Sequence, residues 1–72
     1  MKKETVAITT EFIRLDALLK ISGVAETGGQ AKVLIQDGTV YLNGAVCTQR
    51  GKKVVVGDRV TFDQLEIEVI AP

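Results

Sequence analysis

The apolar residues of this chain repeat with two different periods, and each change of period marks a new element. Residues 5–9 place Val6 and Ile8 two apart, which predicts a short first strand. From Arg14 the apolar residues recur at i, i+3 and i+4, which predicts a helix of about two turns ending at Ser22-Gly23. A second stripe with this spacing follows after a short connection, so two helices should meet at an angle.

The second helix carries its own start and stop signals. Thr27 predicts an N-cap whose hydroxyl accepts a first-turn N–H group, and Gln30, three residues later, predicts a capping box. Gly38 predicts an end in the left-handed conformation that glycine adopts without strain. One stripe of the helix is expected to pack on the core, and another face stays free for contacts. The packed stripe is Ala31, Leu34 and Ile35, and the free face is Gly28, Lys32 and Gln36.

After the second helix the chain is typical of short strands joined by tight turns. Asn43-Gly44 predicts a type I′ hairpin, and Gly57-Asp58 predicts a further turn. The expected extended segments are residues 39–42, 45–48, 54–56, 59–63 and 65–70. The predicted fold is therefore α+β, with two short angled helices packed on a small, twisted, mostly antiparallel sheet.

Composition narrows the class of protein without naming a function. Hydrophobic residues make up 46% of the chain and aromatic residues 4%, so the core should be aliphatic and belong to a single domain over residues 1–72. A single cysteine and no histidine exclude a disulfide framework and argue against a zinc finger or a Cys-His catalytic pair. No apolar run approaches the length of a membrane span. We expect a cytoplasmic, unexported monomer with no cofactor and no metal.

Positive and negative side chains are segregated along a chain whose formal net charge is zero. Arg50, Lys52 and Lys53 cluster in one short segment, with Lys20 and Lys32 upstream, whereas acidic residues gather toward the C-terminus. A neutral molecule can therefore carry one basic side.

Two features on that side could bind phosphate. Gly28-Gly29 costs about 1 kcal/mol per residue relative to alanine inside a helix, and bare first-turn amides let an anion approach the helix N-terminus. Alternatively, the two glycines only ease a tight junction between helices. The segment from Arg50 to Lys53 places three cations around a flexible glycine, which makes either a compact phosphate-binding loop or an ordinary solvated one. Lys32 and Gln36 could contact the same ligand or lie on a solvated face.

Familiar catalytic patterns are missing from the sequence. Gly44 and Gly51-Lys52 enclose six residues where a nucleotide-binding P-loop has four. The acidic residues are scattered, and no two of them are placed as a pair for general acid-base chemistry. We therefore expect a protein that is not an enzyme.

Several short motifs, taken in order, resemble those of the S-four RNA-binding domain, also described as the alpha-L motif. They extend from about residue 14 to residue 62, which would be the core motif of the domain. The motifs are Arg14-Leu15-Asp16, Gln30-Ala31-Lys32, Gly38-Thr39-Val40, Leu42-Asn43-Gly44 and Val56-Gly57-Asp58-Arg59-Val60. The segment from Thr27 to Lys32 is similar to the small stand-alone bacterial, YbcJ/YaaA-like branch of this family.

The resemblance implies binding of structured RNA, ribosomal or tRNA-like, through the helix pair and the adjoining loop, with the ribosome as one expected partner. The residues that it places at the RNA are Lys20, Gly28, Gly29, Lys32, Gln36, Arg50, Lys52 and Lys53. Many members of the family carry Ser-Arg where Gly28-Gly29 stand, so an arginine that could pair with a base or a phosphate is absent. The resemblance implies no membrane partner, metal or cofactor.

A protein-interaction module with a ubiquitin-like sheet is the alternative, since such sheets also combine an Asn-Gly hairpin with a late Gly-Asp turn. A sulfur carrier of that fold needs a C-terminal Gly-Gly, and the chain ends Ile70-Ala71-Pro72, so that role is not expected. One continuous basic face would favour RNA binding, whereas an apolar patch would favour an adaptor.

Overall fold

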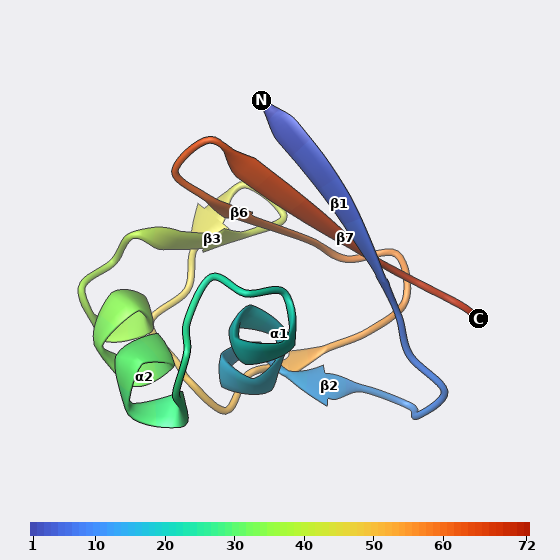
Figure 1. Ribbon diagram of the computed structural model, residues 1–72, viewed down its shortest axis with the longest axis horizontal. Coiled ribbons are helices and arrows are strands. Elements are labelled where there is room, and N and C mark those ends of the chain that lie inside the picture. Colours follow the sequence, from blue (N-terminus) through green and yellow to red (C-terminus); the bar gives the residue numbers. More distant parts are fainter.

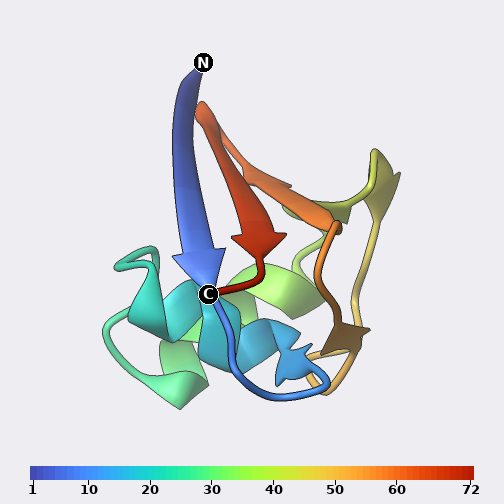
Figure 2. The ribbon, with the colours of Figure 1, turned by 90° about the vertical axis from the view of Figure 1, so that its right-hand side faces the viewer.

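The computed structural model describes residues 1–72, with two helices on one side of a twisted sheet (Figure 1 and Figure 2). The helices are α1 (Leu15–Ile21) and α2 (Gly28–Gln36). The strands are β1 (Lys2–Ala7), β2 (Ile13–Arg14), β3 (Val40–Leu42), β4 (Ala45–Val46), β5 (Lys53–Val54), β6 (Arg59–Phe62) and β7 (Leu65–Ile70). Neither helix has the length and apolar character that a membrane crossing requires.

The main sheet has five strands in the order β1-β7-β6-β3-β4. β1 runs parallel to β7, and the two lie side by side in both views, whereas the other neighbouring strands are antiparallel. β2 and β5 form a separate two-stranded antiparallel ladder next to the start of α1. The predicted α+β class and mostly antiparallel sheet are confirmed.

An aliphatic core fills the space between the helices and the sheet. Leu15, Leu18 and Leu19 of α1 and Ile35 of α2 are completely buried. They form one cluster with inward side chains of the sheet and of β5, which are Val40, Val54, Val60, Ile67 and Val69. The helical spacing read from the sequence therefore identified the buried faces correctly, because packing of an apolar stripe is what holds short helices in place.

The predicted ends of α2 are confirmed. Thr27 Oγ1 accepts the N–H of Gln30 at 3.1 Å, and Gly38 closes the helix at φ +79°. The return bond of the capping box differs from the prediction, because Gln30 Oε1 accepts the N–H of Glu26 at 2.7 Å and reaches one residue beyond the N-cap. The start of α2 is thus fixed by the side chains of Thr27 and Gln30.

The hairpin after α2 also has its predicted geometry. Asn43 and Gly44 stand at φ +51° and +87°, as the two central positions of a type I′ turn require. The Asn43 side chain accepts the N–H of Arg59 at 2.9 Å and donates to Asp58 Oδ1 at 3.0 Å, which joins this turn to the later one. The strand β6 is therefore anchored at its start by the hairpin that precedes it.

Three strands differ from the sequence predictions by more than one residue. The first strand is Lys2–Ala7 rather than residues 5–9, because its ends are set by the parallel register with β7, in which Lys2 lies opposite Leu65. The return strand β4 has two residues instead of four. Of the extended segment predicted at 54–56, only Val54 joins a strand, paired with Ile13 outside the main sheet. Alternation within a segment does not reveal such non-local partners.

Candidate nucleic-acid interface

The loop of residues 47–52 is fastened to the first turn of α1. The Leu15 N–H donates to the Lys52 carbonyl at 2.9 Å, and the Asp16 N–H donates to the Arg50 carbonyl at 3.0 Å. The first N–H groups of a helix have no acceptor within the helix, so these loop carbonyls satisfy them. The cationic side chains of the loop consequently have fixed starting points beside α1.

Asp16 lies at the centre of this junction with only 7% of its surface exposed. Its carboxylate accepts bonds from Arg14 Nε and Nη2, both at 3.2 Å, and from Arg50 Nε at 3.1 Å. The Ala17 N–H donates a fourth bond at 2.8 Å. One buried carboxylate thus joins two arginines, one from β2 and one from the loop.

The ionisation of Asp16 follows from this environment. Burial alone raises the pKa of the carboxyl, but hydrogen bonds from Arg50, the Ala17 N–H and Arg14 outweigh it and hold the pKa below its ordinary value of 3.8. Asp16 is therefore a carboxylate at neutral pH, and its charge offsets part of the charge of the two arginines.

Acid should remove a measurable part of the stability through Asp16. Because its folded-state pKa is depressed, the carboxylate stabilises the fold fully above about pH 4, and this contribution disappears as the pH falls through the folded-state pKa. Urea unfolding should show wild-type protein more stable than Asp16→Asn at pH 6, with the two converging as the pH falls below about 4. A constant difference across this range would contradict the assignment. Asp63→Asn, which changes an exposed carboxylate without an ion pair, should show no such convergence.

Bare backbone lies against both guanidinium groups. A side chain at Gly51 would begin 3.5 Å from Arg14 Nη2, and a side chain at Gly28 would begin 3.9 Å from Arg50 Nη2. The second distance shows that the first residue of α2 lies beside the arginine of the loop. The start of α1, the loop and the start of α2 therefore converge on one place.

The β2–β5 ladder adds another cation to this group. Arg14 lies directly opposite Lys53, so both side chains share one face of the ladder, while Ile13 and Val54 share the other. The Lys53 ammonium stands 4.8 Å above the ring of Phe12, a cation–π distance. Lys52, the last residue of the loop before β5, is exposed. We call Arg14, Arg50, Lys52 and Lys53 the basic cluster.

The remaining predicted residues flank the basic cluster without contacting it. Lys32 and Gln36 are exposed on α2, one and two turns beyond Gly28 on the same side of the helix. Lys20 is exposed on α1, one turn beyond Asp16. Gly29 is exposed, and a side chain there would meet Thr27 rather than Arg50. The structure thus places Gly28 beside Arg50 and Lys53 opposite Arg14, whereas Lys52 lines a hollow with the β3–β4 hairpin. The other four predicted residues lie around them.

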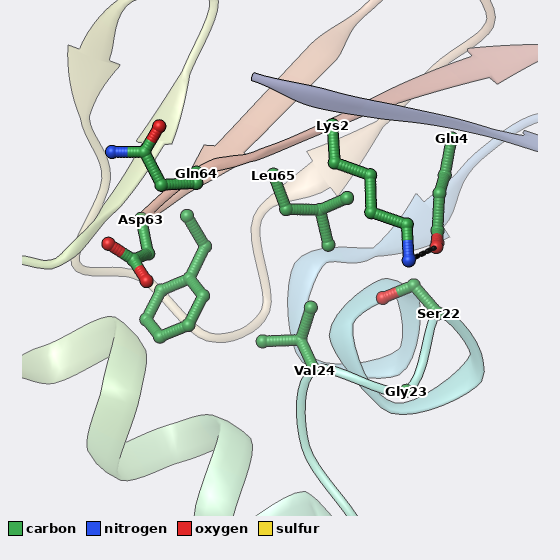
Figure 3. A pocket seen from close by; sticks show the side chains of 9 residues that line it. Lys2, Glu4, Ser22, Gly23, Val24, Asp63, Gln64 and Leu65 are labelled. Carbon is green, nitrogen blue, oxygen red and sulfur yellow. Dashed lines mark ion pairs between the residues drawn. The ribbon is translucent and has the colours of Figure 1, made fainter.

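One hollow on the surface lies away from these residues. It has a volume of about 360 Å³ and lies among the start of β1, the connection after α1 and the β6–β7 turn (Figure 3). Lys2 and Glu4 pair at 3.7 Å on one wall, and Val24 and Leu65 supply apolar side chains. It contains no residue of the basic cluster and none of the residues predicted to contact RNA.

Comparison with known proteins places this fold in a family. A family model described as the S4 domain matches residues 6–70. The chain belongs to the S4 domain family. It is 41% identical over 59 residues to the "Putative RNA-binding protein YbcJ" of Escherichia coli, which covers 82% of this chain and 84% of that protein. It is 36% identical over 58 residues to the "Probable ribosome maturation protein RlbA" of Bacillus subtilis, with coverage of 81% and 82%.

A solved structure is similar to this S4 domain along nearly its whole length. The solution structure of Escherichia coli YbcJ matches with a TM-score of 0.66 and 35% identity, covering 99% of this chain and 89% of that one. Its description names an alpha-L motif involved in RNA binding. The family resemblance and the fold predicted from the sequence are both confirmed.

The residues predicted to contact RNA did not include Arg14, which belongs to the basic cluster, or Asp16, which binds two of its arginines. Both lie in the Arg14-Leu15-Asp16 motif, so the sequence carried a signal for the segment. It carried none for the partner, because Arg50 meets Asp16 from 34 residues away. Arg14 was also beyond reach of a pattern argument, since its opposition to Lys53 depends on the unpredicted β2–β5 ladder.

Proposed function

We propose that this S4 domain binds structured RNA without catalysis, using the basic cluster and the free face of α2 to contact the phosphate backbone. The observation that carries the proposal is the convergence of Arg14 and Arg50 on Asp16, next to the first turn of α2. Arginine forks match the oxygens of a phosphate in pairs, and helix N-termini favour anions. A site of this kind recognises charge and shape and requires no metal.

The first turn of α2 offers additional donors for the same ligand. The hydroxyl of Thr27 accepts the N–H of Gln30, and the first backbone bond within the helix is the Ala31 N–H to the Thr27 carbonyl. The N–H groups of Gly28 and Gly29 are left without acceptors in the protein. With no side chains on these two residues, a phosphate oxygen has room to reach their amides.

RNA is the polyanion that this proposal favours, with ribosomal or ribosome-associated RNA as the target. One relative is named as an RNA-binding protein, another as a ribosome maturation protein, and the similar solved structure is described by an RNA-binding motif. A-form RNA hides its base edges in a deep, narrow major groove, so a small basic surface reads backbone geometry at a stem, junction or loop. We expect the free face of α2, with Lys32 and Gln36, to extend the contact beyond the basic cluster.

A protein-interaction module remains the alternative function. Its signature would be a contiguous exposed apolar patch. Large exposed apolar side chains occur here singly, such as Ile21 on α1 and Val33 on α2, or as the cross-strand pair of Tyr41 and Val46, which is too small to form a large patch. Single exposed apolar residues are ordinary on protein surfaces, so they favour no second function.

Salt dependence tests the proposed function. If about three to four phosphates are neutralised, the log-log slope of affinity against salt should lie between roughly −2 and −4. Fluorescence anisotropy with a labelled stem-loop RNA, repeated from low to physiological salt, measures this slope. A DNA duplex of the same stem sequence is the control, because it shares the charge but not the A-form geometry. Absence of RNA binding, or an affinity that does not change with salt, would contradict the proposal. Equal affinity for the RNA and the DNA duplex would contradict the part of the proposal that requires recognition of A-form geometry.

A further inference from the structure

We propose that Asp16 is a positioning residue that holds the Arg14 and Arg50 guanidinium groups side by side, so that the pair clamps one phosphate of the RNA backbone. This inference rests on the proposed RNA binding and assigns it a specific phosphate contact. It also adds Arg14 to the residues that touch RNA. The ligand chemistry is a phosphodiester with two free oxygens, one for each guanidinium.

The geometry of the carboxylate brings the two cations together. A single oxygen, Asp16 Oδ2, accepts from Arg14 Nη2 at 3.2 Å and from Arg50 Nε at 3.1 Å. Two guanidinium groups would otherwise repel each other at such a separation. The backbone reinforces the arrangement, since the Asp16 N–H donates to the Arg50 carbonyl at 3.0 Å. The arginine pair is therefore arranged before any ligand arrives.

Both arginines keep donors for a ligand. A guanidinium carries five N–H groups, and Asp16 engages Nε and Nη2 of Arg14 but only Nε of Arg50. The side chains of Arg14 and Arg50 remain 54% and 40% exposed, whereas that of Asp16 is 10% exposed. The carboxylate thus lies beneath the cations, and their free donors are accessible to a phosphate. Gly28 leaves open the space next to Arg50 Nη2.

Two possible roles of Asp16 predict opposite changes in RNA affinity when Asp16 is replaced by asparagine. If Asp16 only lowers the charge of the basic cluster, its neutralisation should strengthen attraction to RNA. If Asp16 positions the arginines, asparagine should weaken binding, because its NH₂ group is a donor and cannot accept from an arginine N–H. One guanidinium would then be released from its fixed place. The sign of the change decides between the two roles.

The test compares wild-type protein, Asp16→Asn and Asp63→Asn against the same labelled stem-loop RNA over a range of salt. We expect Asp16→Asn to bind about 10-fold more weakly, with a salt slope reduced by about 0.7 to 0.9, the value of one lost phosphate contact. Asp63→Asn removes the same charge at the exposed β6–β7 turn, where asparagine also tolerates the φ of +54°, and should bind like wild type or slightly tighter. Unchanged or tighter binding by Asp16→Asn overturns the inference. Absence of RNA binding by wild-type protein would instead overturn the proposed function, and the clamp with it.

A second variant keeps the inference testable if Asp16→Asn does not fold. Arg50→Lys retains the charge but cannot bond Asp16 through Nε and a phosphate through Nη at the same time. We expect its affinity for the RNA to fall about 5- to 10-fold, from the loss of one charge-assisted hydrogen bond. Arg59→Lys, an exposed position on β6, should leave affinity unchanged. Wild-type affinity in Arg50→Lys would overturn the clamp.

A spectroscopic readout separates positioning from general stability. In folded Asp16→Asn, the ¹⁵Nε–¹Hε resonances of Arg14 and Arg50 should move toward those of freely rotating arginines, while the backbone amide spectrum retains its dispersion. Resonances of both arginines at their wild-type positions would show that Asp16 does not hold them, and would overturn the inference.

Discussion

Replacing Arg50, Lys52 and Lys53 together by alanine is expected to weaken binding to the stem-loop RNA about 100- to 1000-fold while the protein stays folded. Each lost charge-assisted contact removes on the order of 1 to 1.5 kcal/mol of binding free energy. Since a tenfold change in the dissociation constant corresponds to about 1.4 kcal/mol, three lost contacts together raise it by two to three powers of ten. The loss should be similar for RNAs of different sequence, because phosphates carry no base identity. Anisotropy titrations with several stem-loops measure it.

The stability of this variant should fall only moderately. Exposed cations alone would contribute little, and a sequence-based expectation is therefore no change. The structure alters that expectation, since Arg50 donates to the buried carboxylate of Asp16 at 3.1 Å. Arg14 continues to bond Asp16, so we expect a loss of about 1 to 2 kcal/mol in the free energy of unfolding. A domain of this length has a free energy of unfolding of roughly 4 to 11 kcal/mol, so we expect the variant to remain folded.

A matched variant distinguishes the basic cluster from total charge. Lys2, Lys3 and Arg59 are three exposed cations on β1 and β6, away from the loop. Replacing them by alanine removes the same charge, and their ion pairs, such as Lys3 with Glu66 at 4.0 Å, are surface pairs of small value. We expect less than about a 10-fold loss of RNA affinity from this long-range effect. Equal losses in the two triple variants would mean that RNA binding does not depend on the loop.

The features of the fold that could be predicted from sequence are those that depend on one residue or on near neighbours. Thr27 caps its helix through a bond three residues away, and Asn43-Gly44 needs only two positive φ angles. The parallel pairing of β1 with β7 joins opposite ends of the chain, and no residue in β1 encodes it locally. Strand ends are set by the partner's length and register, which explains why these boundaries were wrong.

The residues of the candidate site likewise divide into those that a local sequence pattern predicts and those that depend on distant partners. Arg50, Lys52 and Lys53 were predicted because three cations in four positions form a local pattern, and Gly28 because glycine is unexpected in a helix. Asp16 was not found, since an aspartate in the first turn of a helix is common and gives no sign of a distant arginine. The cation–π contact of Lys53 with Phe12 likewise depends on the β2–β5 ladder, whose two-residue strands are too short to be predicted from a sequence pattern.

Replacing Gly28 and Gly29 together by alanine is expected to raise stability and weaken RNA binding at once. Neither glycine has a positive φ, and both belong to the first turn of α2. A methyl group at Gly28 would lie 3.9 Å from Arg50 Nη2, and one at Gly29 would lie 3.9 Å from Thr27 Oγ1, which are ordinary contacts. The fold therefore tolerates alanine at both positions, and the view that the glycines serve a tight helix junction predicts a strain that these distances do not show.

The size of the gain follows from helix propensity. Glycine costs up to about 1 kcal/mol relative to alanine in a helix interior, and somewhat less in the first turn, so the double variant should gain about 1 to 2 kcal/mol. In a domain of this size that corresponds to a rise in melting temperature of roughly 4 to 16 °C. Thermal unfolding followed by circular dichroism measures the shift. A lower melting temperature would show that the glycines are structural after all.

The single variants locate the ligand. A methyl group at Gly28 enters the space next to Arg50, where we place the phosphate, whereas a methyl group at Gly29 points toward Thr27. If a phosphate lies between Arg50 and the start of α2, Gly28→Ala should weaken binding to the stem-loop RNA about 10-fold and more than Gly29→Ala does, because a displaced charge-assisted bond is worth at least 1 kcal/mol. Equal and undiminished binding by both would mean that no ligand approaches α2 closely, and would leave the basic cluster alone to hold the RNA.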